Sequence, residues 1–286
     1  LPCQECGRRF PLVGSYNLRL PSPKKPSKTH ALFHDPGQSF YVAADRRAGT
    51  FSAVVHDGPP QRTPTLANAI VGGRKARGKT ATCPFCGYSH PLETHKRLAQ
   101  EGLGRDALLV VGDHNDVVSK TFRAPVEDEL AAAASAGSFL RREGPFSPLI
   151  PAIPDEAIPL NSGATIRPQL YGAHTYGDLM VDRQTLSFVR LARTINNLTA
   201  ELLERGLSGD YARALTAMAG SQMARQARYS TRGAWQRARP GGGVEVAGIF
   251  VNESTIAFSH DNFEAGIGTG PGTWDSMISG AAGSLS

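Results

Sequence analysis

The chain has 286 residues, 40% of them hydrophobic, and a formal net charge of +6. That length accommodates two domains with cores of their own, which excludes a mini-protein held together only by cross-links. No apolar run approaches the roughly 18 residues needed to cross a bilayer, and the N-terminus lacks the features of a secretory signal. We therefore expect a cytoplasmic protein without a membrane span, and the basic balance favours a polyanionic partner such as DNA.

All the cysteines belong to two copies of the pattern Cys-x-x-Cys-Gly, which begin at Cys3 and at Cys83. Two residues between thiolates let a tight turn aim both sulfurs at one tetrahedral ion, and the glycine that follows supplies a positive φ. Two such knuckles leave no open coordination position for a substrate. The pattern predicts a structural zinc ion held by Cys3, Cys6, Cys83 and Cys86.

Other uses of these cysteines are disulfides, a redox pair or an iron–sulfur cluster. The absence of an export signal argues against disulfides. A redox-active Cys-x-x-Cys pair would lie at the start of a helix in a βαβ unit, and it would not need a second copy of the pattern. His30, His34 and His56 are ligands in principle, but four thiolates already complete a tetrahedron. We interpret these histidines as surface or hairpin residues.

Residues 7–82 separate the two knuckles, a long interval for a zinc ribbon. Strand-like pieces at 31–34, 39–43 and 50–55 are separated by turns at Gly37 and Gly49. This spacing predicts an antiparallel sheet that grows out of the zinc hairpins, so that residues 1–90 form a zinc ribbon with an inserted β-sheet.

Gly73 to Thr80 matches the Walker A pattern, and residues 66–71 before it are strand-like. A phosphate-binding loop must run into a helix, however, and here the second knuckle begins at Cys83. We predict a basic loop that enters the knuckle. An ATPase would need a helix beginning at Lys79.

The region at 91–144 is predicted to be a small α/β unit, with a helix at 91–102, a strand at 107–111 and helical propensity at 130–135. Prolines recur from Pro145 to Pro168, which predicts an extended linker at 145–170. Asp178 and Gly206 are suitable as the N-cap and the C′ residue of a long helix, and Ser208 starts a second one. We expect a helical hairpin within residues 171–240.

Basic and aromatic residues alternate after the second helix. Guanidinium groups grip phosphates and aromatic rings stack on bases, so the segment is a candidate DNA contact; a solvated basic helix end is the alternative. The candidate residues are Arg225, Arg228, Tyr229, Arg232, Trp235, Arg237 and Arg239.

Gly266 to Gly272 is similar at a glance to a dinucleotide or methyl-donor loop. The residues before it, 259–262, are polar rather than a buried strand, and Pro271 blocks a helix at that point. We predict a flexible loop followed by a short helix from Trp274. A strand at 244–251 is expected earlier in the same 241–286 region.

The order of these features resembles the large prokaryotic adenine-specific DNA methylases that contain a zinc ribbon, some of them found in phage-defence systems. The resemblance rests on the second knuckle at 78–87, on Phe-Arg-Ala-Pro-Val-Glu-Asp-Glu-Leu at 122–130 and on Ile-Pro-Asp-Glu-Ala-Ile-Pro at 153–159. Tyr171-Gly172, Asp178-Leu179 and Arg183-Gln184 follow in the family's order. Tyr176 and Met180 replace its usual aromatic residues.

The resemblance implies an S-adenosylmethionine-dependent fold in which this segment lies between two catalytic motifs, Asp-Pro-Phe-x-Gly-Gly-Gly and Asp-Pro-Pro-Tyr. Neither motif occurs in the chain, so we assign no catalytic or cofactor-binding residue and expect no autonomous catalysis. The chain is then a fragment of α+β class that supplies scaffold, with 241–286 belonging to an incomplete methyltransferase fold. A stand-alone zinc-ribbon module that binds nucleic acid or protein is the alternative.

Overall fold

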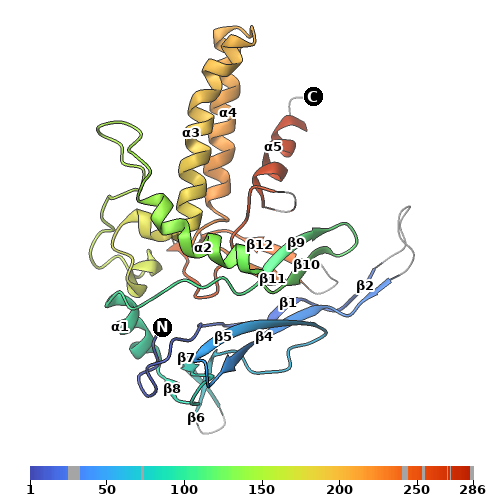
Figure 1. Cartoon of the computed structure of the whole chain (residues 1–286), viewed down its shortest axis with the longest axis vertical. Helices are drawn as coiled ribbons and strands as arrows, with labels where there is room; N and C mark the ends of the chain where they lie inside the picture. Colours follow the sequence, from blue (N-terminus) through green and yellow to red (C-terminus); the bar gives the residue numbers. More distant parts are fainter. Residues whose placement is uncertain are drawn as a thin grey trace.

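The structure is a computed structural model that describes residues 1–24, 33–71, 74–239, 244–252, 255–268, 270 and 272–283. It confirms a mixed α+β chain in which small antiparallel sheets accompany α-helices (Figure 1). The strands gather at one end of the molecule, and the two long helices stand away from them (Figure 1).

Two three-stranded antiparallel sheets occupy the N-terminal part. The predicted strands at 39–43 and 50–55 are confirmed, with positive φ at Gly37 (79°) and Gly49 (72°) in the turns. Residues 31 and 32 of the first predicted strand lie outside the described residues. The first sheet has the order β1-β4-β5, from β1 (Asn17–Arg19), β4 (Gln38–Asp45) and β5 (Thr50–Asp57); the second has the order β6-β7-β8, from β6 (Leu66–Val71), β7 (Arg74–Thr82) and β8 (Ser89–His90).

Among the described residues no ladder joins the two sheets, so the inserted sheet does not continue from the cysteine hairpin as we expected. Each has its own core. Phe40, Val42 and Tyr16 are buried in the first, where the Tyr16 and Phe40 rings meet edge to face at 5.0 Å. Leu66 and Phe85 are buried in the second. A two-stranded arm extends beyond the first sheet, from β2 (Ser22–Lys24) and β3 (Phe33–Asp35).

The Walker-like segment is a strand rather than the basic loop we predicted. β7 begins at Arg74 and pairs antiparallel with β6, which has the bounds that the sequence indicated. Thr80 and Lys79 are paired across the ladder with Ala67 and Asn68. Because strand pairing fixes this backbone in an extended form, no helix begins at Lys79 and the segment lacks the geometry of a phosphate-binding loop.

The middle of the chain has the two helices that the sequence predicts, but its strands differ, because the hairpin of residues 111–123 was not predicted. Residues 107–110 form no helix or strand, and the ladder begins only at Val111. The apolar run Ala107 to Val110 instead lines a cavity, where Ala107 is exposed and Leu108 to Val110 are half-buried. The elements here are α1 (Leu92–Gln100), β9 (Val111–Asn115), β10 (Ser119–Arg123) and α2 (Glu127–Leu140).

Residues 145–166 have no helix or paired strand beyond isolated bridges, as the prolines predict. Part of this segment lies along residues 174–177: Ile158 donates its amide to His174, and Gly177 donates to Pro154. Two short 3₁₀ turns follow, η1 (Arg167–Tyr171) and η2 (Tyr176–Leu179).

The helical hairpin is confirmed, with a later start than predicted. α3 (Asp182–Glu204) begins after Val181, whose amide donates to Gln184 Oε1. Asp178 accepts the amides of His174 and Thr175 and caps η2, so it is not the N-cap of the long helix. Gly206 has φ of 86°, and Ser208 caps α4 (Gly209–Ala227). Both predicted caps at the bend are therefore confirmed.

The C-terminal part returns to the strands. The predicted strand at 244–251 is split, because Gly248 and Ile249 lie between two ladders and the Ile249 amide donates to the Arg228 carbonyl. The short helix from Trp274 is confirmed and packs against α4 (Figure 1). The elements are β11 (Trp235–Ala238), β12 (Val244–Ala247), β13 (Phe250–Asn252), β14 (Thr255–Ile256) and α5 (Trp274–Gly283).

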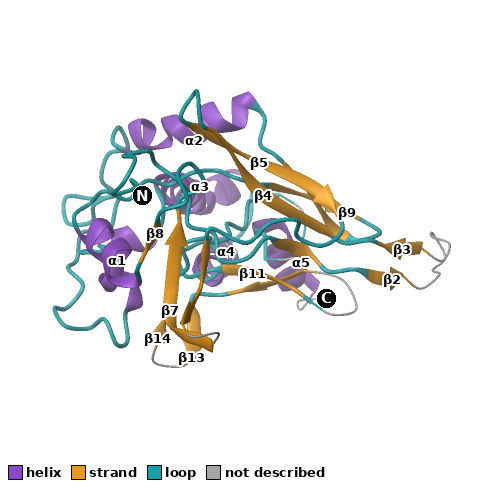
Figure 2. Ribbon diagram, turned by 90° about the horizontal axis from the view of Figure 1, so that it is seen from below, coloured by secondary structure: helices purple, strands orange, loops and turns teal. Residues whose placement is uncertain are grey.

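Figure 2, from below, shows the strand β7 beside β8 and α1, with α3 and α4 seen end on behind them. β11 lies against β1, where Gln236 Nε2 donates to the Leu18 carbonyl at 2.9 Å. In the part of the chain that the structure describes, no helix combines the length and the apolar character of a membrane span.

Candidate metal centre

The four cysteines converge on one point although the chain separates the pairs widely. Their sulfur atoms all lie within 4.8 Å of one another, with 3.6 Å between Cys3 and Cys86 and 3.8 Å between Cys6 and Cys83. A tetrahedron with metal–sulfur bonds of about 2.3 Å has edges of about 3.8 Å. The sulfur positions therefore fit one four-coordinate metal ion.

The two knuckles have the same backbone hydrogen bonds. In the first knuckle, the Cys3 amide donates to the Arg8 carbonyl and the Gly7 amide donates to the Cys3 carbonyl. In the second, the Cys83 amide donates to the Tyr88 carbonyl and the Gly87 amide donates to the Cys83 carbonyl. Gly7 and Gly87 have φ of 70° and 80°, a region open to glycine at no steric cost. Two equivalent turns thus present two sulfurs each, as the sequence pattern predicts.

Burial separates the sulfurs into two kinds. Cys3 and Cys83 are buried, whereas Cys6 is half-buried and Cys86 is exposed. Burial raises the pKa of the Cys3 thiol, and it raises that of Cys83 to about 12, against the opposing hydrogen bonds of neighbouring backbone amides. The amide of Arg8 lowers the pKa of Cys6. These amide donors stabilise the thiolate forms that bind a metal.

His90 is a further residue at the centre, which we did not predict. Its side chain is buried at 1% exposure, and its Nε2 lies 3.4 Å from the Cys3 sulfur. A thiolate has no proton to give, so with metal bound the imidazole N–H is the donor. The ring also contacts Phe10 and Tyr88. Only its place four residues after Cys86, at the end of β8, could have indicated it.

The histidines considered from the sequence lie apart from the sulfurs. His34 is exposed at the β2–β3 arm, and His56 on β5 lies against Tyr41, with its Nδ1 3.0 Å from the Asp57 carbonyl. His30 falls outside the described residues. Neither described histidine belongs to the metal-ligating group.

The predicted basic segment is brought together only in part. Arg232 forms a two-pronged ion pair with Asp106, and Arg239 pairs with Glu245. Arg228 lies over the rings of Tyr229 and Phe250 at 5.7 and 5.8 Å. Arg225 and Arg237 are exposed, and Trp235 is exposed on β11. Within the described part of the chain, the arginines of this segment without a carboxylate partner are therefore Arg225, Arg228 and Arg237.

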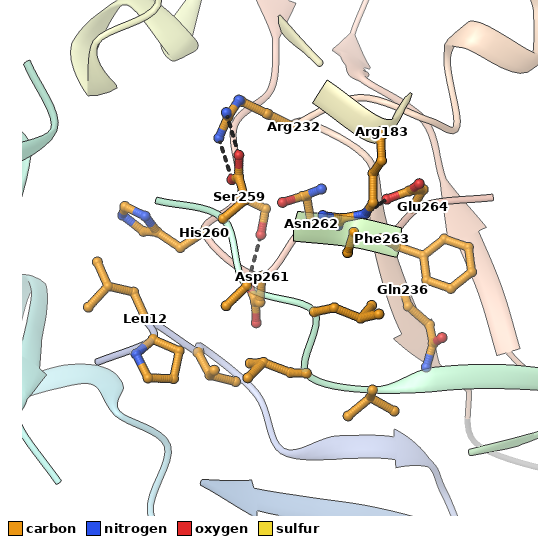
Figure 3. A pocket seen from close by; sticks show the side chains of 18 of the residues that line it. Leu12, Arg183, Arg232, Gln236, Ser259, His260, Asp261, Asn262, Phe263 and Glu264 are labelled. Carbon is orange, nitrogen blue, oxygen red and sulfur yellow. Dashed lines mark hydrogen bonds and ion pairs between the residues drawn. The ribbon is translucent and has the colours of Figure 1, made fainter. Parts of the chain in front are cut away.

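A large cavity of about 1,100 Å³ lies between the N-terminal strands and the C-terminal segment 258–266 (Figure 3). Its lining includes apolar residues from 107 to 111 and several ion pairs, among them Arg183 with Glu264 at 2.6 Å. Asp261 accepts the amides of Gly14 and Ser15 and so joins the two walls. Sequence reasoning missed this cavity, because its walls come from distant parts of the chain.

Comparison of the chain with protein-family models, with curated proteins and with solved structures finds no match.

Proposed function

We propose that the cysteine centre holds one structural Zn²⁺ and forms a zinc ribbon. The convergence of four sulfurs at tetrahedral spacing supports it most directly. Four thiolates leave no open coordination position, so the ion cross-links the chain and activates no water. It fastens residues 1–10 to the β7–β8 hairpin and closes the interval between the knuckles.

The test is metal content and stability in single-cysteine variants. We expect one zinc per purified chain and loss of that zinc in Cys83→Ser, with unfolding of the N-terminal sheets. His90→Phe is expected to keep the zinc but to weaken its affinity on the order of 10- to 100-fold, because the ring no longer donates to the Cys3 sulfur. A matched control is His34→Phe on the exposed arm. Equal affinities in the two variants would remove His90 from the centre.

We further propose that this chain is the central segment of an S-adenosylmethionine-dependent, adenine-specific DNA methyltransferase. The order of motifs from the second knuckle to Arg183-Gln184 supports it. The segment supplies scaffold and DNA contacts, while the remainder of the methyltransferase chain binds S-adenosylmethionine and carries the catalytic motifs. Arg225, Arg228 and Arg237 are the residues of the basic segment that contact DNA in this proposal.

DNA binding is tested by fluorescence anisotropy over a range of salt concentrations. Replacing Arg225, Arg228 and Arg237 by alanine is expected to lower affinity and to reduce the salt slope by about 0.9 for each phosphate that is no longer neutralised. The control removes the same charge elsewhere, from Arg97, Arg190 and Arg193, which form ion pairs with glutamates. Equal weakening by both triple variants would reject the assigned surface.

The methyltransferase assignment has its own test. We expect no S-adenosylmethionine binding and no methylation by this chain alone, and methylation of adenine once it is joined to a chain that carries both catalytic motifs. Methylation by the isolated 286 residues would contradict the proposal. DNA or protein binding without any gain of methylation in the joined chain would favour the stand-alone module.

A further inference from the structure

One cation in the large cavity has no hydrogen-bond or ion-pair partner among the described residues. Lys120, on β10, is 4% exposed and lines the cavity. Its ammonium donates no hydrogen bond and forms no ion pair within the part of the chain that the structure describes. A lysine this buried is ordinarily paired, because burying an isolated charge costs free energy.

The other charged side chains of the cavity wall all have hydrogen-bond or ion-pair partners. Each lining carboxylate accepts from a side chain or from backbone amides, and each lining arginine donates to a carboxylate or a carbonyl. The carboxylates are Asp106, Glu129, Asp178, Asp261 and Glu264, and the arginines are Arg9, Arg105, Arg183 and Arg232. Arg9 and Arg105 donate only to carbonyls, whereas the Lys120 ammonium has neither a hydrogen-bond nor an ion-pair partner among the described residues.

The backbone of Lys120 is fixed in place. Its carbonyl accepts a hydrogen bond from Arg19 Nη1 at 2.6 Å, and Arg19 is itself held by the buried carboxylate of Asp35. Two residues further along β10, the amide of Phe122 donates to Gln38 Oε1 at 2.9 Å. Because β10 is held to the first sheet on this side, the lysine is presented from a rigid strand rather than from a loop.

The surroundings of the ammonium suit an anion. The backbone at Gly270 lies close to both the Lys120 ammonium and the His114 ring. A Cβ atom added to this glycine would lie 3.2 Å from Lys120 Nζ and 3.7 Å from His114 Nδ1. His114 is directly opposite Lys120 in the β9–β10 register and lies on the same face. The Phe263 ring lies 6.0 Å from the ammonium. Among the described residues, the one carboxylate beside these two side chains is that of Asp116, which lies 3.1 Å from His114 Nε2.

The start of α5 does not supply the anion contact. The amides of Trp274 and Asp275 donate to the carbonyls of Gly266 and Ile267, and Ser276 donates to Thr273 Oγ1. The first amides of the helix are therefore already used. Lys120 is the available donor in the cavity lining.

We propose that this cavity binds a small amphipathic organic anion, whose phosphate or carboxylate meets the Lys120 ammonium while its apolar body lies against the cavity wall. The lining provides that apolar surface, from Leu108 and Val110 of the extended segment to Phe122 and Phe263. Apolar surface combined with a few placed polar groups is the usual form of a small-molecule site. The bound anion would neutralise the lysine, which burial otherwise disfavours in its charged form.

Calorimetry on the zinc-loaded 286-residue chain tests the proposal with two charged probes and their uncharged counterparts. Adenosine monophosphate against adenosine reports a phosphate, and phenylbutyrate against phenylbutanol reports a carboxylate. We expect at least one anion to bind at least tenfold more tightly than its neutral counterpart, and the pair that does so identifies the group. Failure of both anions to bind would overturn the proposal.

Lys120→Met separates the lysine from the cavity as a whole. It is expected to weaken the anion at least tenfold, to leave the neutral counterpart unchanged and to preserve the melting temperature without ligand, because it removes an unpaired buried charge. Lys96→Met, on α1 beside Glu93 and outside the cavity, is the matched control. Unchanged anion affinity in Lys120→Met would overturn the proposal.

A second measurement needs no variant. Reductive methylation of the wild-type chain, read by mass spectrometry, is expected to modify Lys120 less when the anion is present, whereas Lys96 is modified equally with and without it. This comparison keeps the proposal testable should Lys120→Met fail to fold. Equal labelling of Lys120 in both conditions would contradict an anion at this residue.

Discussion

The cysteine centre joins residues that are far apart in the chain, whereas the α3–α4 hairpin is formed by a short local bend. The sulfurs of the centre come from residues 3–6 and 83–86, so ligands far apart in the chain meet at one point. In the hairpin, residues 205–208 join two helices, with Gly206 in the left-handed region and the Ser208 cap directly after it. Long closure costs more chain entropy than a four-residue bend, and a bound ion offsets that cost. The first region should depend on metal and the second on local caps.

Metal removal is expected to give the largest difference between the regions. Chelation of zinc should unfold residues 1–90, because buried sulfurs such as Cys3 and Cys83 lose the ion that joins them. Hydrogen exchange read by mass spectrometry checks this. Amides of β4 to β8 should lose protection, while those of α3 and α4 keep theirs. Equal loss in both regions would show that the hairpin also depends on the centre.

Breaking the buried ion pair of Arg19 and Asp35 is expected to have the next largest effect. Asp35 is fully buried and accepts hydrogen bonds from both Nε and Nη2 of Arg19, at 2.6 and 2.8 Å. Asp35→Ala leaves an unpaired charge inside the first sheet and should cost about 3–5 kcal/mol of unfolding free energy. Asp57→Ala, at the exposed end of β5, is the control in urea denaturation and should cost under about 0.5 kcal/mol.

Acid is expected to destabilise the contact between the strand region and the C-terminal segment through His260. Burial lowers the pKa of His260 to about 3, and the nearby His95, which stacks on it at 5.6 Å, adds to the effect. Between pH 6.5 and 3 the unfolded chain binds a proton that the folded chain does not. Stability therefore falls on acidification, by at most about 1.4 kcal/mol per pH unit for this group.

The measurement is thermal melting from pH 7.5 to 4.5. His260→Phe should flatten the pH dependence, since a phenyl ring keeps the contacts with Tyr171 and Phe258 without titrating. His174→Phe, at an exposed position, should leave the slope unchanged. An unaltered slope in the His260 variant would assign the acid sensitivity to other groups.

Removal of the cap at the hairpin bend is expected to give the smallest effect. Ser208 Oγ accepts the amide of Tyr211 at the start of α4. Ser208→Ala leaves that amide unpaired and should cost about 1 kcal/mol. Ser221→Ala, whose hydroxyl donates to the Met218 carbonyl within the same helix, should cost less. Denaturant midpoints at equal slope measure both; a cap variant as stable as the control would show that tertiary packing alone holds the bend.

The local elements were predictable where one short pattern determines them. The knuckles, the β4–β5 hairpin, the caps at Gly206 and Ser208 and the helix from Trp274 all follow from a few neighbouring residues. Strand pairing was harder to predict from the sequence. The apolar run at 107–111 indicated a strand, but residues 107–110 instead line a cavity that other segments complete. The Walker-like letters indicated a loop, yet pairing with β6 holds them as a strand.

The candidate sites also differ in how far the sequence alone predicts them. Four cysteines in two copies of a pattern predict a shared ion without any knowledge of the fold, and the structure brings them together. His90 and Lys120 carry no pattern. Their roles depend on which residues surround them after folding, Cys3 in one case and the cavity wall in the other. The partners of Arg232 and Arg239 also became evident only in three dimensions.

X-ray absorption at the zinc edge of the purified chain tests the central claim most directly. Four sulfur ligands at about 2.3 Å, with one zinc per chain, are the predicted result. Fewer sulfur ligands, with nitrogen or oxygen in the first coordination sphere, would contradict a closed centre made of Cys3, Cys6, Cys83 and Cys86. So would a chain that contains no zinc and remains folded with its four thiols free.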